Sequence, residues 1–170
     1  LRAGHEIAWH VLTHGPEERY NLIPYKEQKA ILYEAKKRIE EVTTKEVISF
    51  RSPAYKINVD TIKALEENGF RLDSSVNPQR LGIFSSDLMN TGWIYSPRKP
   101  YHPSFNNPFI SVEKGVALWE IPQSAFIFPF MSNTGIAFGE KFMKLFYRML
   151  YLESYFSKNA IVYMFHPEDI

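Results

Sequence analysis

The chain has 170 residues, of which 45% are hydrophobic and 15% aromatic, and its 20 basic side chains nearly balance 19 acidic ones. This composition suits one folded domain with its own core and excludes a disordered chain. No run approaches 18 consecutive apolar residues, so we expect no membrane span, and a net charge of +1 gives no global field for nucleic acid. The chain has no Cys, which excludes disulfides and a Cys nucleophile but leaves the compartment open.

The first half of the chain alternates short apolar runs with helical patterns. The expected elements are a strand over 5–9, an amphipathic helix over 24–42, a strand over 47–50, a helix over 59–68 and a strand over 70–72. In the second helix, Ile62 and Leu65 are expected to face inward, with Gly69 just past its end.

The second half continues the alternation. A strand is expected over 116–119, a helix over 140–156 and a last strand, covered on both faces, over 160–165. The apolar side of the long helix is expected to consist of Phe142, Leu145, Phe146, Met149 and Leu152. Strands that alternate with helices predict a parallel α/β sheet or barrel.

Residues 77–115 form a long stretch with few periodic signals, rich in Pro and aromatic residues. A stretch of this length in a compact domain often lines or covers a site. A β-hairpin insertion is the equal alternative.

Polar residues recur where the expected strands end. The residues in these positions are His10, Arg51, Asp73, Glu120 and His166. In parallel α/β folds, active sites gather at the carboxyl ends of the strands. This repeated coincidence predicts one site at that edge.

His10 and His14, which are four residues apart, are the candidate metal ligands. On one helical turn both imidazoles would point the same way and could hold a divalent ion such as zinc. The alternative is a pair of surface or capping histidines, and a metal would need a third protein ligand.

Arg51 and His166 are the candidate catalytic residues. A guanidinium at a strand end can fix and orient a carboxylate, and a titratable imidazole can act as a general acid. The alternatives are a surface Arg beside a turn and a hydrogen-bonded core His.

In this order, the motifs resemble the polysaccharide deacetylase family, the NodB-homology domain of carbohydrate esterase family 4. The stretches that carry the resemblance are Gly4-His5-Glu6-Ile7 leading to His10-Val11-Leu12-Thr13-His14, Arg51-Ser52-Pro53, Gly69-Phe70-Arg71-Leu72-Asp73-Ser74-Ser75, Leu118-Trp119-Glu120-Ile121-Pro122 and Phe165-His166-Pro167. The resemblance spans essentially the whole chain as one domain.

The resemblance implies a distorted (β/α) barrel with a metal, usually zinc, held by an Asp, His10 and His14. Metal-activated water would remove an N-acetyl or related acyl group from an amino sugar or polysaccharide. Arg51 would orient the carboxylate base, and His166 would protonate the leaving amine. Tyr55, Asp73, Trp119 and Glu120 would contact the substrate.

The family's first motif, T-F-D-D-[GD], is absent from this sequence. We therefore expect that the first one or two βα units of the domain are missing and that the chain alone is inactive. The missing segment or a second copy would then cover an open sheet edge. The other departures are Val11 in the His motif and Ala54-Tyr55 after R-x-P, where an aromatic-Gly pair is commoner.

Two alternatives remain open at this point. One is an amidohydrolase of a non-sugar amide or cyclic imide on the same fold. The other is a non-catalytic module that binds carbohydrate or a partner, which is what loss of the Asp-Asp motif would produce.

Overall fold

The computed structural model of the protein describes residues 4–11, 15, 19–78 and 92–166. It divides into two compact units, Leu1–Ser75 with Tyr101–Ile121 and Val76–Pro100 with Pro122–Ile170. We refer to them as the first and second units.

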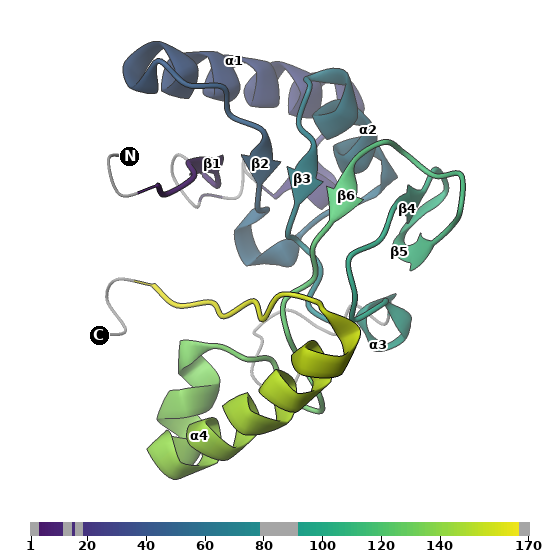
Figure 1. Cartoon of the computed structure of the whole chain (residues 1–170). Coiled ribbons are helices and arrows are strands. Elements are labelled where there is room, and N and C mark those ends of the chain that lie inside the picture. The colour runs from purple at the N-terminus through teal and green to yellow at the C-terminus, as the bar shows by residue number, and fades with distance from the viewer. Residues whose placement is uncertain (1–3, 12–14, 16–18, 79–91, 167–170) are drawn as a thin grey trace. The chain divides into compact units, whose positions relative to one another are not determined.

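The first unit contains a four-stranded parallel sheet (Figure 1). Its strands are β1 (Ala8–Trp9), β2 (Ser49–Phe50), β3 (Leu72–Asp73) and β6 (Trp119–Glu120), in the order β1-β2-β3-β6. All neighbouring pairs are parallel, which confirms the expected parallel α/β arrangement. Among the described residues β1 lies at one edge, and closure into a barrel stays a prediction.

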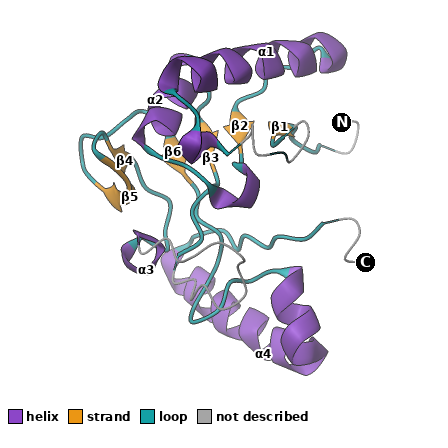
Figure 2. Cartoon of the chain, turned by 180° about the vertical axis from the view of Figure 1, so that it is seen from behind, coloured by secondary structure: helices purple, strands orange, loops and turns teal. Residues whose placement is uncertain are grey.

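Helices α1 (Tyr25–Thr43) and α2 (Val59–Glu67) pack against each other beside this sheet (Figure 2). Helix α2 begins with a capping box, because the Asn58 side chain accepts from the Thr61 amide while the Thr61 hydroxyl accepts from the Asn58 amide. Ile62 and Leu65 are buried, and Gly69 has φ of +75°, as the sequence predicts. Both helices therefore form close to the expected boundaries.

The part of the first unit's core that lies next to the sheet consists of aromatic side chains. Phe50 is 1% exposed and lies edge-on to both Tyr20 and Phe70. Leu32 of α1 and Leu65 of α2 are fully buried. The apolar spacing of the two helices produces this core.

Part of the stretch 77–115 is an antiparallel hairpin. Strands β4 (Pro103–Ser104) and β5 (Asn107–Ser111) pair, and Tyr101 bridges to Glu120 of β6. The hairpin alternative is thus correct for this segment. A short helix, α3 (Gly92–Tyr95), belongs to the second unit, and residues 79–91 lie outside the described residues.

The second unit is built around α4 (Ser132–Ser157). Gly139 has φ of +81° and ψ of 170°, so the helix is interrupted one residue before its expected start at 140. Phe130, Phe146 and Leu150 form its buried cluster, with Phe142 partly buried against them.

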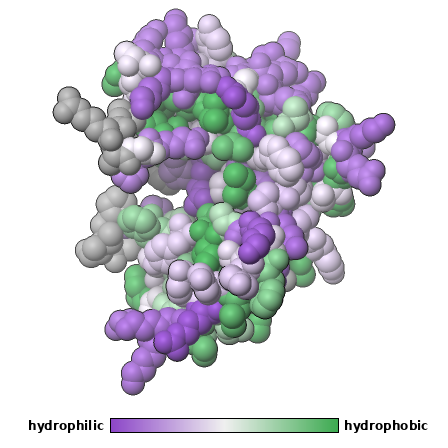
Figure 3. All heavy atoms as spheres, viewed as in Figure 1, coloured by the Kyte–Doolittle hydropathy of each residue, from purple (hydrophilic) through white to green (hydrophobic). Residues whose placement is uncertain are grey.

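The expected apolar side of α4 is correct only in part. Leu145, Met149 and Leu152 are 47–58% exposed, because the buried face follows 142, 146 and 150 instead. The helix is apolar around most of its circumference, so residue spacing does not single out one face. Figure 3 shows mainly hydrophilic side chains over α1 and several hydrophobic ones over α4.

The strand expected over 160–165 is largely wrong. Only Met164 makes a parallel bridge, to Met131, and Phe165 is 51% exposed. Val162 and Met164 instead make irregular backbone contacts with Ser124 and Phe130. No helix in the described part of the chain is long and apolar enough to cross a bilayer.

Candidate functional site

The four parallel strands of the first unit end in register. Trp9, Phe50, Asp73 and Glu120 are successive partners across the sheet. The ladder continues one residue further: Arg51 N donates to Trp9 O at 3.0 Å, Ser74 N to Phe50 O at 3.0 Å and Ile121 N to Asp73 O at 2.7 Å. The structure therefore brings His10, Arg51, Asp73 and Glu120 together at the carboxyl ends of the four strands, as the sequence predicts. We call this side of the sheet the sheet edge.

His10 directly follows β1 and is half-buried. Its ring Nδ1 lies 2.7 Å from the Arg51 carbonyl oxygen. A carbonyl can only accept, so Nδ1 carries the proton and the neutral ring has its lone pair on Nε2. Metal-binding histidines in proteins commonly have this arrangement, with the second nitrogen bonded to a carbonyl.

The donor set for a metal is incomplete in the described residues. His14 lies outside them, and among the residues described no group of three His, Cys, Asp or Glu side chains gathers as a metal site. His10 fits a ligand role on its own geometry.

The Arg51 side chain is fixed by the next strand. Its Nη2 donates to the Ser74 hydroxyl at 2.6 Å, and that hydroxyl donates to the Ile121 carbonyl at 2.7 Å. Arg51 is half-buried, and Ser74 links its guanidinium to the residues that follow β3 and β6. A cation in this position can orient a carboxylate.

Asp73 and Glu120 form a buried pair of carboxyl groups. Asp73 is 1% exposed and Glu120 is 0% exposed. Burial raises the pKa of Asp73 to about 6, although hydrogen bonds with Ser75 and Glu120 and the charge of Arg51 act in the opposite direction. Asp73 therefore keeps its proton to a higher pH than an exposed Asp does.

Tyr101 lies beside β6, where its backbone pairs with Glu120. Its hydroxyl donates to the Pro108 carbonyl at 2.7 Å. Burial, together with the negative charges of Glu120 and Asp73, raises the pKa of Tyr101 above its usual value, so the phenol stays protonated.

Ser75 connects Asp73 to the loop after β2. Its hydroxyl donates to Asp73 Oδ1 and accepts from the Ser52 amide at 2.8 Å. The candidate residues from the sequence include neither Ser74, Ser75 nor Tyr101. The signal for the serines was the D-S-S run at the end of β3, whereas Tyr101 depends on a bridge far along the chain.

The loop after Arg51 contains an unusual backbone. Ala54 and Tyr55 both have positive φ, +48° and +59°, within the 3-10 turn η3 (Pro53–Tyr55). Side chains with a Cβ disfavour this region by about 1–2 kcal/mol per residue. Tyr55 is 5% exposed, so its side chain packs inside the first unit.

Trp119 lies on the opposite face of β6 from Glu120, because neighbouring residues of a strand alternate in direction. It is 43% exposed, and the His102 ring packs on it with 3.8 Å between centroids. The structure therefore separates Trp119 from the buried carboxyl pair.

His166 belongs to the second unit and is half-buried.

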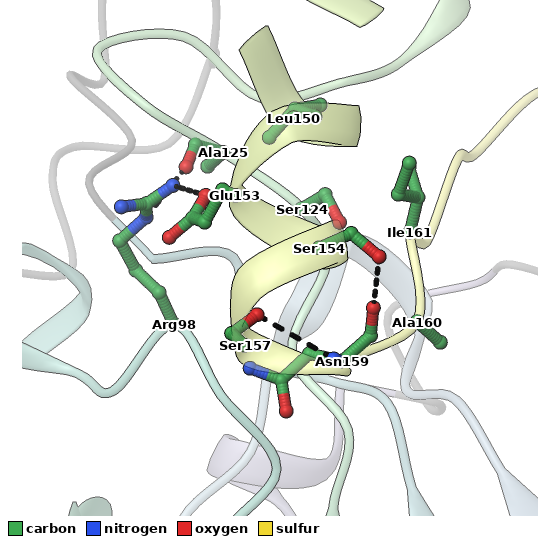
Figure 4. Close-up of a pocket in the computed structure, with 10 residues that line it drawn as sticks. All are labelled: Arg98, Ser124, Ala125, Leu150, Glu153, Ser154, Ser157, Asn159, Ala160 and Ile161. Carbon is green, nitrogen blue, oxygen red and sulfur yellow. Dashed lines mark hydrogen bonds and ion pairs between the residues drawn. The ribbon is translucent and has the colours of Figure 1, made fainter. Parts of the chain in front are cut away.

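A cavity of about 20 Å³ in the second unit lies between the end of α4 and residues 124–125 and 159–161 (Figure 4). Arg98 lines it, pairs with Glu153 at 2.5 Å and donates to the Ala125 carbonyl at 2.7 Å. This volume holds about one water molecule, so the cavity is too small for a sugar.

Comparison with known proteins shows what the first part of the chain is similar to. Residues 1–72 match the family model "Polysaccharide deacetylase". Over these residues the chain is similar to that family, which confirms the resemblance seen in the motifs there. The matched residues include His10 and Arg51.

A curated relative gives the same indication. A peptidoglycan deacetylase-like protein, FGM2, of Gibberella zeae is 39% identical over 85 residues, which are 50% of this chain. The chain spans about a quarter of that relative's length, 24%. A solved structure of a candidate polysaccharide deacetylase from Mycobacterium smegmatis matches with a TM-score of 0.49 and 25% identity, over 72% of this chain and 33% of the other.

Proposed function

We propose that the protein is a metal-dependent hydrolase that removes N-acetyl or related acyl groups from an amino sugar or polysaccharide. The observation that carries this proposal is the hydrogen bond between the His10 ring and the Arg51 carbonyl. It joins the two residues that the family motifs single out, within the segment that matches the family.

The proposed metal site consists of His10 and His14 with a third ligand from outside the described residues. Zinc, when bound, would polarise the acyl carbonyl and activate water. The Nδ1–H bond of His10 to a carbonyl supports this role because it favours the tautomer in which Nε2 carries the lone pair, as metal-binding histidines require.

The proposed catalytic residues are Arg51 and His166. The guanidinium would orient the carboxylate that takes a proton from water, and the imidazole would donate a proton to the leaving amine. The exposed side of Trp119 and the loop with Tyr55 would contact the sugar. The sequence predicts the same contact for Asp73 and Glu120, but both are buried, so they would instead support the ends of β3 and β6 from the interior. The parallel sheet would be part of a distorted barrel.

The test measures zinc binding and acetate release in the whole protein. N-acetylglucosamine oligomers and a cyclic imide are offered in parallel, with His10→Ala as the variant. The matched control is His5→Ala, which removes an exposed imidazole five residues away. We expect stoichiometric zinc and acetate release that are lost in His10→Ala and kept in His5→Ala.

Three results would contradict the proposal. Zinc binding that His10→Ala leaves intact would remove the metal assignment. Hydrolysis of the imide without acetate release from the sugar would indicate an amidohydrolase. Sugar binding with no hydrolysis of either substrate would indicate a non-catalytic module.

A further inference from the structure

Ser74 makes two side-chain hydrogen bonds at the sheet edge. Its hydroxyl accepts from Arg51 Nη2 at 2.6 Å and donates to the Ile121 carbonyl at 2.7 Å. We propose that Ser74 is a positioning residue that holds the Arg51 guanidinium in its working orientation. This inference rests on the proposed role of Arg51.

The direction of the two bonds explains why a hydroxyl is needed. A hydroxyl has one proton, and here the Ile121 carbonyl takes it, because a carbonyl can only accept. The oxygen lone pairs are then directed toward the guanidinium, which can only donate. A bond to a charged group is stronger than one between neutral groups, so the orientation is well defined.

The backbone around Ser74 is fixed independently of its side chain. Ser74 N donates to the Phe50 carbonyl at 3.0 Å, within the ladder between β2 and β3. Arg51 N is likewise bonded to the Trp9 carbonyl at 3.0 Å. Both residues therefore start from rigid strand ends, and the hydroxyl is the contact that restricts the long Arg51 side chain.

The position of the guanidinium has an electrostatic consequence. The Arg51 charge acts on the buried Asp73 and lowers the pKa of that carboxyl. If the guanidinium moves away, this effect on the pKa weakens. The hydrogen bond from the backbone amide of residue 74, which also lowers the pKa of Asp73, remains in place. Asp73 is thus a sensor of the Arg51 position that does not depend on catalysis.

The experiment combines this sensor with activity in the whole protein. The variants are Ser74→Ala, Ser74→Thr, Arg51→Met and the double variant Ser74→Ala with Arg51→Met. The control is Ser49→Ala, which removes a hydroxyl of β2 that bonds to Glu6 instead. The Asp73 pKa is measured by NMR titration with ¹³C-labelled aspartate, and kcat/KM is measured on the acetylated oligomer.

We expect Ser74→Ala to raise the Asp73 pKa and to lower kcat/KM by about tenfold. Ser74→Thr should restore both, because the hydroxyl is kept, and Ser49→Ala should change neither. In the double variant, the Asp73 pKa should equal that of Arg51→Met alone, because Ser74 acts through the guanidinium.

The outcomes separate this inference from the proposed function. An unchanged Asp73 pKa and kcat/KM in Ser74→Ala would overturn the positioning role even in an active enzyme. Additive pKa shifts in the double variant would also overturn it. Absence of deacetylation in the wild type, together with the expected pattern of Asp73 pKa values, would reject the proposed function and keep Ser74 as the residue that positions Arg51.

Discussion

Asp73 and Glu120 are direct partners across strands β3 and β6, and both are buried from solvent. Two carboxyl groups on one face of adjacent parallel strands can be accommodated only if they do not both carry charge in the same low-polarity space. Ser75 and the Arg51 charge reduce this cost but do not remove it, since the pKa of Asp73 is still raised to about 6.

This pair predicts how stability depends on pH. The folded-state pKa of Asp73, about 6, lies above its unfolded value of about 3.9. The folded state therefore binds the proton more tightly, and the stabilisation is complete below about pH 4 and is lost as the pH rises through 6. The expected loss is about 3 kcal/mol at most, measurable by urea unfolding between pH 4 and 7.

Asp73→Asn should flatten this dependence, because the amide does not titrate. The control Glu34→Gln changes an exposed carboxyl of α1 and should keep the wild-type slope. A slope that persists in Asp73→Asn would assign the dependence to another group.

A second prediction concerns the strained loop after Arg51. Ala54 is exposed and has φ of +48°, so Ala54→Gly should stabilise the protein by about 1 kcal/mol through relief of the left-handed backbone. The same change at Ala30, an exposed position inside α1, should destabilise by about 1 kcal/mol. Thermal and urea unfolding measure the stability of both variants. If both substitutions changed the stability in the same direction, the left-handed backbone at Ala54 would be contradicted.

A third prediction tests which face of α4 is buried. Leu150 is 3% exposed and Leu145 is 57% exposed on the same helix. Leu150→Ala should cost about 2–5 kcal/mol, whereas Leu145→Ala should stay within about 0.5 kcal/mol. Urea unfolding compares them, and an equal loss would mean that the Leu145 face is covered in the protein.

The order of strands and helices in the first unit could be predicted from sequence because local patterns decide it. The apolar spacing of α1, the capping residues of α2 and the polar residue after each strand all point to the same arrangement. His10, Arg51, Asp73 and Glu120 meet at one edge because parallel strands in register bring their ends together.

The remaining features depend on contacts between distant segments. The apolar run over 160–165 has the composition of a buried strand, but its backbone makes irregular contacts with residues 124 and 130–132 instead of a ladder. The bridge of Tyr101 to β6 joins positions 19 residues apart, and no periodic pattern in the sequence predicts it. The hydrogen bond between Arg51 and Ser74 likewise depends on where the Arg51 side chain points.

The His10 ring is hydrogen-bonded to the backbone carbonyl of Arg51, which a substitution of the Arg51 side chain does not remove. Substitution of Arg51 leaves that carbonyl in the chain, so the preferred tautomer of His10 survives loss of the guanidinium. A change that bends the backbone at 51–53, such as one at Pro53, would instead alter the imidazole without touching it. The charge at the strand ends and the tautomer of His10 can therefore be varied separately, by changing the side chain in one case and the path of the main chain in the other.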